Sequence, residues 1–237
     1  MPGSDTLGTV TVTAILPLPA GLAQRPEAVF VPVAGASPLL RVSHGLGPGA
    51  QLVVASSPSL AASVQDCIGD IAAAQQVSVR LVVAESPATR AQCVAAALGW
   101  IENDEPVLLL DIEWPIVVPV LVERVWDALQ TGAPAAMPVL PVTDSVKAVD
   151  ATGTVRATLD RAALRSVQYP RGYRVAALRA MLSADGSGSF DDAALASAVG
   201  LPVTLVDGDD EAMRVELPRD AEFLSAVLRS RADPAGR

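Results

Sequence analysis

The residues that could do chemistry lie mainly in two segments. Residues 14–30, AILPLPAGLAQRPEAVF, form an apolar run followed by small residues, which is typical of a strand that leads into a phosphate-binding loop. A phosphate-binding lysine is expected just after Pro26, but that position holds Glu27. Asp111 ends the apolar run PVLLLD, and a carboxylate beyond a strand can hold Mg²⁺ against a polyphosphate. The alternative for Asp111 is a strand-end residue that only caps the next turn.

The composition excludes several other kinds of site. His44 is the only histidine in 237 residues, so a histidine-based metal cluster or catalytic triad cannot form. The net charge of −9 disfavours a nucleic-acid partner, although a local cluster of Arg and Lys could still bind a small anion. Two cysteines make no disulfide framework. With neither a signal peptide nor a membrane span in the sequence, we expect a cytoplasmic protein.

Strands and helices alternate in the elements that would position these residues. Apolar runs predict strands at residues 10–17, 51–56, 79–84, 106–112 and 135–142. Helical periodicity predicts helices at 59–76, 88–102, 118–131, 172–183, 191–199 and 218–231, and two short strands are expected near 203–206 and 213–217. This alternation indicates an α/β fold with a mainly parallel sheet covered on both faces.

A hairpin interrupts this alternation. The segment SVKAVDATGTVRATL, residues 145–159, alternates with period two on both sides of a glycine-containing turn. It carries Lys147 and Arg156, and Arg161 follows it. On a projecting hairpin such side chains usually point into solvent. If two or three of them converge, they make an anion site that suits a sugar phosphate.

The central region resembles a known family. The segment PVLPVTDSVKAVDATGTVRATLDRAALRSVQYPRGY and the later FDDAALASAVGLPVTLVDGD are similar to 2-C-methyl-D-erythritol 4-phosphate cytidylyltransferase, over residues 138–210. This family makes isoprenoid precursors by the non-mevalonate pathway, with CTP as co-substrate. The resemblance implies a single nucleotidyltransferase-like domain over residues 1–237, Rossmann-like and three-layered, with a mostly parallel mixed sheet. It also implies a protruding β-arm at 142–168 and a homodimer whose arms interlock.

The resemblance assigns the substrate phosphate to arm residues. Ser145 keeps the hydroxyl of the family's threonine, Lys147 keeps its lysine, and Arg161 keeps the arginine expected to grip the phosphate. In the family, a partner subunit supplies part of this site. Asp111 matches the Asp of the family's Asp-Ala-x-Arg motif and is expected to contact the nucleotide and Mg²⁺.

The motifs of the nucleotide half are altered. Ala20, Gly21 and Arg25 remain from the phosphate-binding loop, but their spacing differs and the second glycine is missing. Arg90 is kept, and Cys93 stands where the family has a hydroxyl. Three further replacements are Trp114 for the Arg of Asp-Ala-x-Arg, Arg214 for a late lysine, and Tyr169 with Arg171 in QYPRG for the family's QTPQG. The expected nucleotide residues are therefore Ala20, Gly21, Arg90, Cys93 and Asp111, with Arg25 and Arg214 as catalytic cations.

These alterations leave three hypotheses. The preferred one is a divergent homologue with weak or absent catalysis, which acts by binding. The second is an active cytidylyltransferase that joins CTP to methylerythritol phosphate and releases pyrophosphate. The third is nucleotidyl transfer with another nucleotide or acceptor, in which Trp114 could stack on a base or fill the pocket floor.

Overall fold

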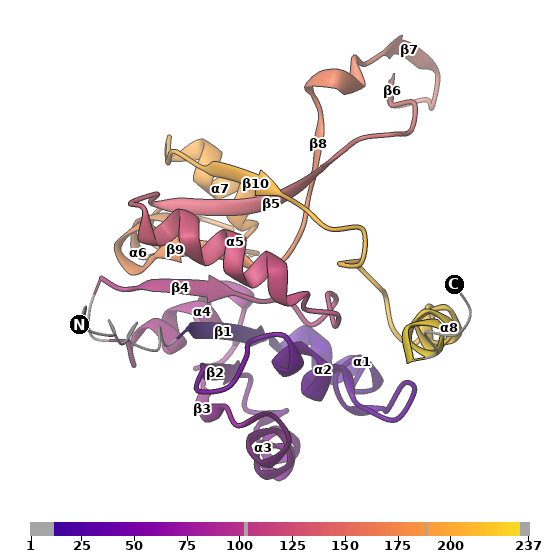
Figure 1. The fold of residues 1–237 in the computed structure, drawn as a ribbon. Helices are drawn as coiled ribbons and strands as arrows, with labels where there is room; N and C mark the ends of the chain where they lie inside the picture. The colour runs from indigo at the N-terminus through magenta and orange to yellow at the C-terminus, as the bar shows by residue number, and fades with distance from the viewer. Residues whose placement is uncertain (1–11, 102–103, 188, 233–237) are drawn as a thin grey trace, which may run out of the picture.

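The computed structural model describes residues 12–101, 104–187 and 189–232, which form one large sheet, flanking helices and a two-stranded arm (Figure 1). The strands are β1 (Thr13–Leu18), β2 (Gln51–Ser56), β3 (Ser78–Val83), β4 (Pro106–Leu109), β5 (Ala135–Pro141), β6 (Lys147–Val149), β7 (Val155–Thr158), β8 (Arg165–Val167), β9 (Arg171–Arg174) and β10 (Thr204–Asp207). The helices are α1 (Glu27–Phe30), α2 (Pro38–His44), α3 (Ala61–Gln75), α4 (Arg90–Leu98), α5 (Pro119–Gln130), α6 (Val175–Ala184), α7 (Asp192–Ala198) and α8 (Ala221–Ala232), with short 3₁₀ helices η1 (Ala20–Gln24) and η2 (Arg161–Ala163).

The sheet is mixed and mostly parallel. Its strand order is β10-β5-β9-β4-β1-β2-β3, and β8 pairs with β5 outside this path. Strand β9 runs antiparallel to both of its neighbours, β4 and β5. The pairs β1·β2, β1·β4, β2·β3 and β5·β10 are parallel. The carboxyl ends of β1 and β4 therefore meet at one edge of the sheet, together with the beginning of β9.

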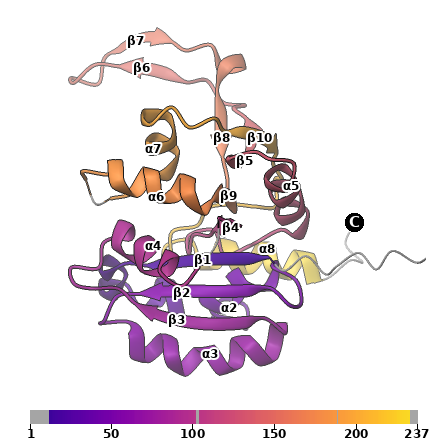
Figure 2. The same cartoon turned by 90° about the vertical axis from the view of Figure 1, so that its left-hand side faces the viewer.

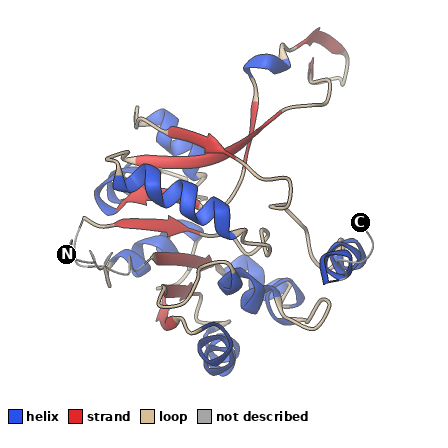
Figure 3. Cartoon of the chain, in the orientation of Figure 1, coloured by secondary structure: helices blue, strands red, loops and turns tan. Residues whose placement is uncertain are grey.

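Two apolar cores lie on opposite faces of the sheet. All six residues of β1 are buried, so this strand is central. Ala14 and Leu16 belong to the core that α2, α3 and α5 cover, whereas Ile15 belongs to the core under α4, α6 and α7. The alternation along one strand sends successive side chains to opposite faces. Helices consequently flank the strands on both sides (Figure 3), which confirms the predicted three-layer α/β fold.

Most predicted elements lie within a few residues of where the sequence placed them, but strand β9 was missed and one predicted strand does not form. The helix expected at 172–183 begins at Val175, because the preceding residues form β9. The strand expected near 213–217 is wrong: these residues form an irregular loop, attached through the Val215 N–H to the Glu113 carbonyl at 2.8 Å. The first two residues of the strand predicted at 10–17 and the last residue of the helix predicted at 88–102 lie outside the described residues.

Strand β9 is possible because residue 172 has no side chain. A Cβ atom at Gly172 would lie 2.6 Å from side-chain carbons of both Val125 and Leu129 in α5. We expect Gly172→Ala to lower the free energy of unfolding by about 1–3 kcal/mol, because both neighbours are buried and overpacking strains a core. Urea denaturation measures the change. Gly69→Ala in α3, where a Cβ meets nothing within 4 Å, is the control and should be neutral or slightly stabilising. Equal stability of the two variants would contradict this reading.

The arm projects from the sheet between β5 and β8. Strands β6 and β7 pair with each other in a separate two-stranded sheet, at the opposite end of the molecule from α3 (Figure 2). The predicted hairpin is thus confirmed, and β8, which the sequence did not indicate, returns the chain to β5. No helix in the described part of the chain has the length and hydropathy of a membrane span.

Candidate active site

The candidate site lies at the sheet edge where β1 and β4 end. Ile15 pairs with Leu109, so the loop after β1 and Asp111 after β4 lie side by side. Leu109 also pairs with Arg171, which brings the start of β9 to the same edge. Two adjoining hollows of about 270 and about 410 Å³ open here and share Arg90, Asp111 and Glu113. Ligands commonly bind at the carboxyl ends of strands in open α/β sheets.

Asp111 is held on both of its carboxylate oxygens. Oδ1 accepts the backbone N–H of Glu113 at 2.9 Å, and Oδ2 pairs with Arg90 Nη1 at 2.9 Å. Burial raises the pKa of Asp111 above its usual range, against the opposing effect of Arg90. Asp111 therefore both caps the turn after β4, as the alternative prediction stated, and faces the two hollows.

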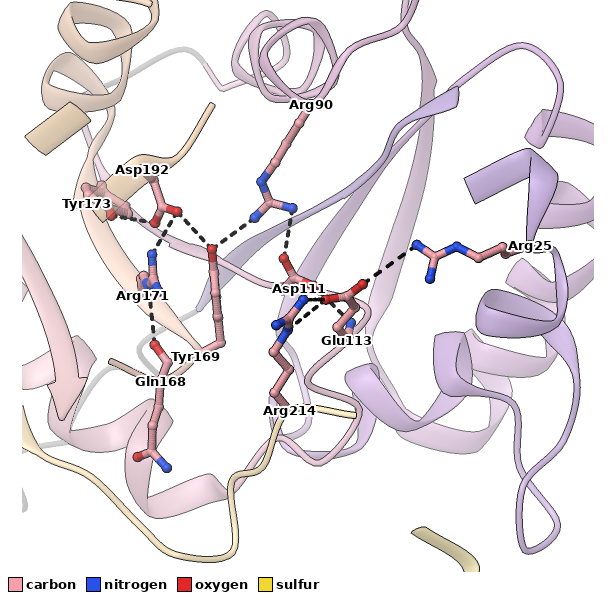
Figure 4. A network of polar contacts seen from close by, with 10 residues as sticks. All are labelled: Arg25, Arg90, Asp111, Glu113, Gln168, Tyr169, Arg171, Tyr173, Asp192 and Arg214. Carbon is pink, nitrogen blue, oxygen red and sulfur yellow. Dashed lines mark hydrogen bonds and ion pairs between the residues drawn. The ribbon is translucent and has the colours of Figure 1, made fainter. Parts of the chain in front are cut away.

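Glu113 brings together the two arginines predicted as catalytic cations. Its Oε2 accepts from Arg214 Nε at 2.8 Å and Nη2 at 2.5 Å, and its Oε1 lies 3.8 Å from Arg25 Nη2 (Figure 4). Arg25 also lies 4.0 Å from Glu216. The sequence interpretation missed Glu113, although its position two residues after Asp111 in DIEW was a usable signal. The structure thus places Arg25, Arg90 and Arg214 around one site, each beside a carboxylate.

A buried carboxylate, Asp192, organises the second hollow. Asp192 Oδ1 accepts from Tyr169 and from Arg171 Nη1, both at 2.8 Å, and Oδ2 accepts from Tyr173 at 2.7 Å. Tyr169 in turn accepts from Arg90 Nη2 at 3.1 Å. A chain of polar contacts therefore runs from α7 through Tyr169 to Arg90 and Asp111 (Figure 4). Burial, followed by the charge of Asp192, raises the pKa of Tyr169 and of Tyr173, so both remain phenols.

Two aromatic residues that replace residues of the family's motifs, Trp114 and Tyr169, meet in this second hollow. The rings of Trp114 and Tyr169 lie 6.0 Å apart at 50°, and Arg171 stands over the Tyr169 ring at 4.2 Å. The replacement Trp114 thus lines the same pocket as Tyr169 and Arg171, which come from a distant segment of the chain. The sequence indicated that these residues differ from the family pattern but not that they contact one another.

The loop after β1 is folded into a short helix rather than an open cradle. Ala20 begins η1, and its N–H donates to the Ala88 carbonyl at 3.0 Å. Gly21 lines the smaller hollow and is exposed. Glu27 is the first residue of α1 and is half-buried. Glu27 is not among the residues that line either hollow, whereas Arg25 lines the smaller one.

Cys93 does not reach the site in this structure. Its side chain lies in α4 with no exposed surface, packed in the core under α4 and α6. Burial raises the pKa of its thiol to about 11, so it remains neutral and unreactive at physiological pH. The hydroxyl expected at this position is thus replaced by a small apolar group that fills the core.

The three predicted phosphate ligands lie on the arm. Ser145 and Arg161 line a hollow of about 390 Å³ there, and Arg161 Nη1 donates to the Thr143 carbonyl. Lys147 Nζ donates to Thr158 Oγ1 at 2.8 Å across the hairpin. All three side chains are exposed, and the arm carries them away from the sheet edge of their own chain (Figure 1).

The arginines at the sheet edge, Arg25, Arg90 and Arg214, can bind a polyphosphate and orient its phosphorus atoms. Arginines present planar arrays of donors that match phosphate oxygens. No group of three or more His, Cys, Asp or Glu side chains suited to a metal ion occurs in the described residues. Asp111 still fits Mg²⁺, because this ion is commonly held by one or two carboxylates together with substrate phosphates.

Comparison with known proteins identifies the family. The sequence model of 2-C-methyl-D-erythritol 4-phosphate cytidylyltransferase matches residues 50–230. The protein of that name from Saccharopolyspora erythraea is 36% identical over 208 residues, which cover 84% of this chain and 89% of the relative. Its counterpart from Frankia casuarinae is 38% identical over 186 residues, which cover 78% of this chain and 66% of the relative.

Solved structures of the same family are similar to this chain. The crystal structure of 2-C-methyl-D-erythritol 4-phosphate cytidylyltransferase from Thermus thermophilus superposes with a TM-score of 0.69 at 30% identity, covering 92% of this chain and 99% of that one. A structure of 4-diphosphocytidyl-2C-methyl-D-erythritol synthase from Anaerococcus prevotii has the same fold, with a TM-score of 0.72 at 20% identity over 92% of this chain and 98% of that one. These matches confirm the resemblance seen in residues 138–210, and the chain belongs to the family of 2-C-methyl-D-erythritol 4-phosphate cytidylyltransferases.

Proposed function

We propose that this protein binds CTP with Mg²⁺ at the edge of β1 and β4 and transfers its cytidylyl group to 2-C-methyl-D-erythritol 4-phosphate at a low rate. The observation that carries the low rate is the pairing of Arg25, Arg90 and Arg214 with carboxylates of the site. In the reaction, a phosphate oxygen of the acceptor attacks the α-phosphorus of CTP, the bond to the β-phosphate breaks, and pyrophosphate leaves.

Side chains in the two hollows would contact different parts of the substrates. Arg25 and Gly21 line the smaller hollow with Arg90 and Asp111, where the triphosphate would lie. Arg214 lines the larger hollow beside it, on the side from which the acceptor would approach. Catalysis of phosphoryl transfer depends mainly on positioning and on cations near the developing charge. Mg²⁺ held by Asp111 and the phosphates would supply further positive charge there.

The altered charges support a reduced rate. At about 5 Å and an effective dielectric constant near 20, one unit charge contributes about 3 kcal/mol. The residue after Pro26 is Glu27 rather than a lysine, but Glu27 does not line either hollow, so its charge acts only at longer range. The single carboxylate of Glu113 lies beside both Arg25 and Arg214 and offsets part of their combined charge. These groups are partly exposed, so solvent screening reduces the effect. We expect kcat/KM about 10²- to 10⁴-fold below that of relatives with the family's motifs.

A homodimer would complete the site. The arm exposes Val149, Val155 and Leu159, with relative exposures of 58%, 57% and 44%. A two-stranded hairpin is marginal in water by itself, so burial of these side chains against a second copy would stabilise the arm. In such a dimer the arm of one subunit would bring Ser145, Lys147 and Arg161 to the acceptor phosphate bound by the other.

The test is pyrophosphate release from CTP, methylerythritol phosphate and Mg²⁺, with the Thermus thermophilus protein assayed beside it. We expect slow release that Lys147→Ala abolishes. Glu27→Lys alone should raise the rate by less than about tenfold, because several positions are altered and Glu27 does not line the site. Release within about tenfold of the Thermus protein, or a large gain from Glu27→Lys alone, would refute the reduced rate. No release under any condition would refute the activity.

A changed nucleotide or acceptor is the second candidate. The observation that favours it is the contact of Trp114 with Tyr169, since these aromatic rings and Arg171 give the larger hollow a wall suited to stacking. Thermal melting with CTP, UTP, ATP and GTP, each with Mg²⁺, separates the two candidates. A shift with CTP alone favours the first, and a larger shift with another nucleotide favours the second.

A further inference from the structure

We infer that Glu113 is a specificity-determining residue, which admits a polyphosphate to the site only when a divalent cation accompanies it. This inference rests on the proposed nucleotide site and concerns which charge state of the ligand the site accepts. The carboxylate of Glu113 lies between Arg25 and Arg214 and contacts one with each oxygen (Figure 4).

The backbone fixes Glu113 in this position. Its N–H donates to Asp111 Oδ1 at 2.9 Å, and its carbonyl accepts the Val215 N–H at 2.8 Å. The first contact ties it to the end of β4, and the second ties it to the loop that carries Arg214. The side chain is 25% exposed, whereas the side chains of Arg25 and Arg214 are 42% and 64% exposed. The carboxylate is therefore more buried than the two arginines that it contacts.

The charges around the site cancel. Glu216, which lies 4.0 Å from Arg25, also pairs with Arg219 at 3.0 Å, and Arg219 pairs in turn with Asp220. Four arginines and four carboxylates are thus linked and leave no net positive charge: Arg25, Arg90, Arg214, Arg219, Asp111, Glu113, Glu216 and Asp220. A metal-free polyphosphate that binds Arg25 and Arg214 competes with Glu113 for them and then lies close to its carboxylate. Two like charges a few ångströms apart repel strongly even near a protein surface. A divalent cation removes this repulsion, because it binds phosphate and carboxylate oxygens together.

Glu113→Gln isolates the charge, since glutamine keeps the size of the side chain and the backbone contacts. The probe is inorganic tripolyphosphate, titrated calorimetrically in a metal chelator and, separately, in Mg²⁺. We expect the variant to bind metal-free tripolyphosphate about 10- to 100-fold more tightly than the unmodified protein. In Mg²⁺ the two proteins should differ by less than about threefold. Glu211→Gln, which removes a carboxylate from the surface pair with Arg231 at 3.6 Å, is the matched control and should resemble the unmodified protein.

The outcomes separate this inference from the proposed function. Equal metal-free affinities of Glu113→Gln and the unmodified protein, an equal gain in Glu211→Gln, or no binding by any of the proteins would overturn the inference. The proposed function is judged by turnover of CTP. If tripolyphosphate behaves as expected and CTP is not turned over, the inference stands without the activity. If CTP is turned over and Glu113→Gln leaves metal-free binding unchanged, the activity stands without the inference.

Discussion

Asp192→Ala should lower the free energy of unfolding by about 3–5 kcal/mol, the range for removing one partner of a buried ion pair. Asp192 is 2% exposed, and its side chain accepts from Arg171, Tyr169 and Tyr173. Burial alone would lower the pKa of Arg171, but Asp192 and the neighbouring phenols more than offset this effect. Without the carboxylate, a guanidinium and two phenols lose their buried partner. Urea denaturation, followed by circular dichroism, measures the loss.

The neighbouring residue provides the control. Asp191 is exposed and caps α7 by accepting the Ala194 N–H at 3.1 Å. Asparagine caps a helix about as well as aspartate, so Asp191→Asn should change the stability by less than about 0.5 kcal/mol. The double variant Arg171→Met with Asp192→Leu should recover part of the loss, because it leaves no unpaired charge. A loss below about 1 kcal/mol in Asp192→Ala would contradict the structural importance of this carboxylate.

Arg90→Met should weaken the binding of CTP with Mg²⁺ by about 100-fold. Arg90 lines both hollows and contacts Asp111 at 2.9 Å and Tyr169 at 3.1 Å. Its removal takes away a cation that is already oriented and leaves Asp111, whose pKa is raised by burial, without its counter-charge. Charge-assisted hydrogen bonds contribute about 1.5–3 kcal/mol each, which corresponds to a loss of roughly this size. Calorimetric titration with CTP measures the change.

Arg80→Met controls for the loss of an arginine elsewhere. Arg80 stands over the exposed ring of Trp100 at 4.5 Å and is not among the residues that line either hollow. We expect this variant to bind CTP as the unmodified protein does. Arg90→Lys should lie between the two, since an ammonium keeps the charge but cannot span Asp111 and Tyr169 as the guanidinium does. Unchanged binding in Arg90→Met would exclude Arg90 from the nucleotide site.

Local patterns in the amino-acid sequence were enough to predict the fold class, and the resemblance of residues 138–210 indicated the family. Apolar runs of strand length alternate with helical periods, and the hairpin at residues 145–159 alternates with period two on both sides of its turn. Burial of apolar faces allows few ways to satisfy such patterns. The family motifs also marked Asp111, Arg25, Arg90 and Arg214, which the folded chain brings to one sheet edge.

Only the three-dimensional structure shows which of these residues contact one another. The groups that pair with the arginines come from distant segments: Glu113 and Arg214 are 101 residues apart in the chain, and Arg90 and Tyr169 are 79 apart. Such pairs depend on strand register, and the antiparallel β9 was hidden because its residues read as the start of a helix. Cys93 matched a motif position, yet the packing of α4 turned it into the core. Local patterns determine which helices and strands form. Long-range strand pairing and packing determine which charged side chains contact one another, because these contacts join segments that are distant in the sequence.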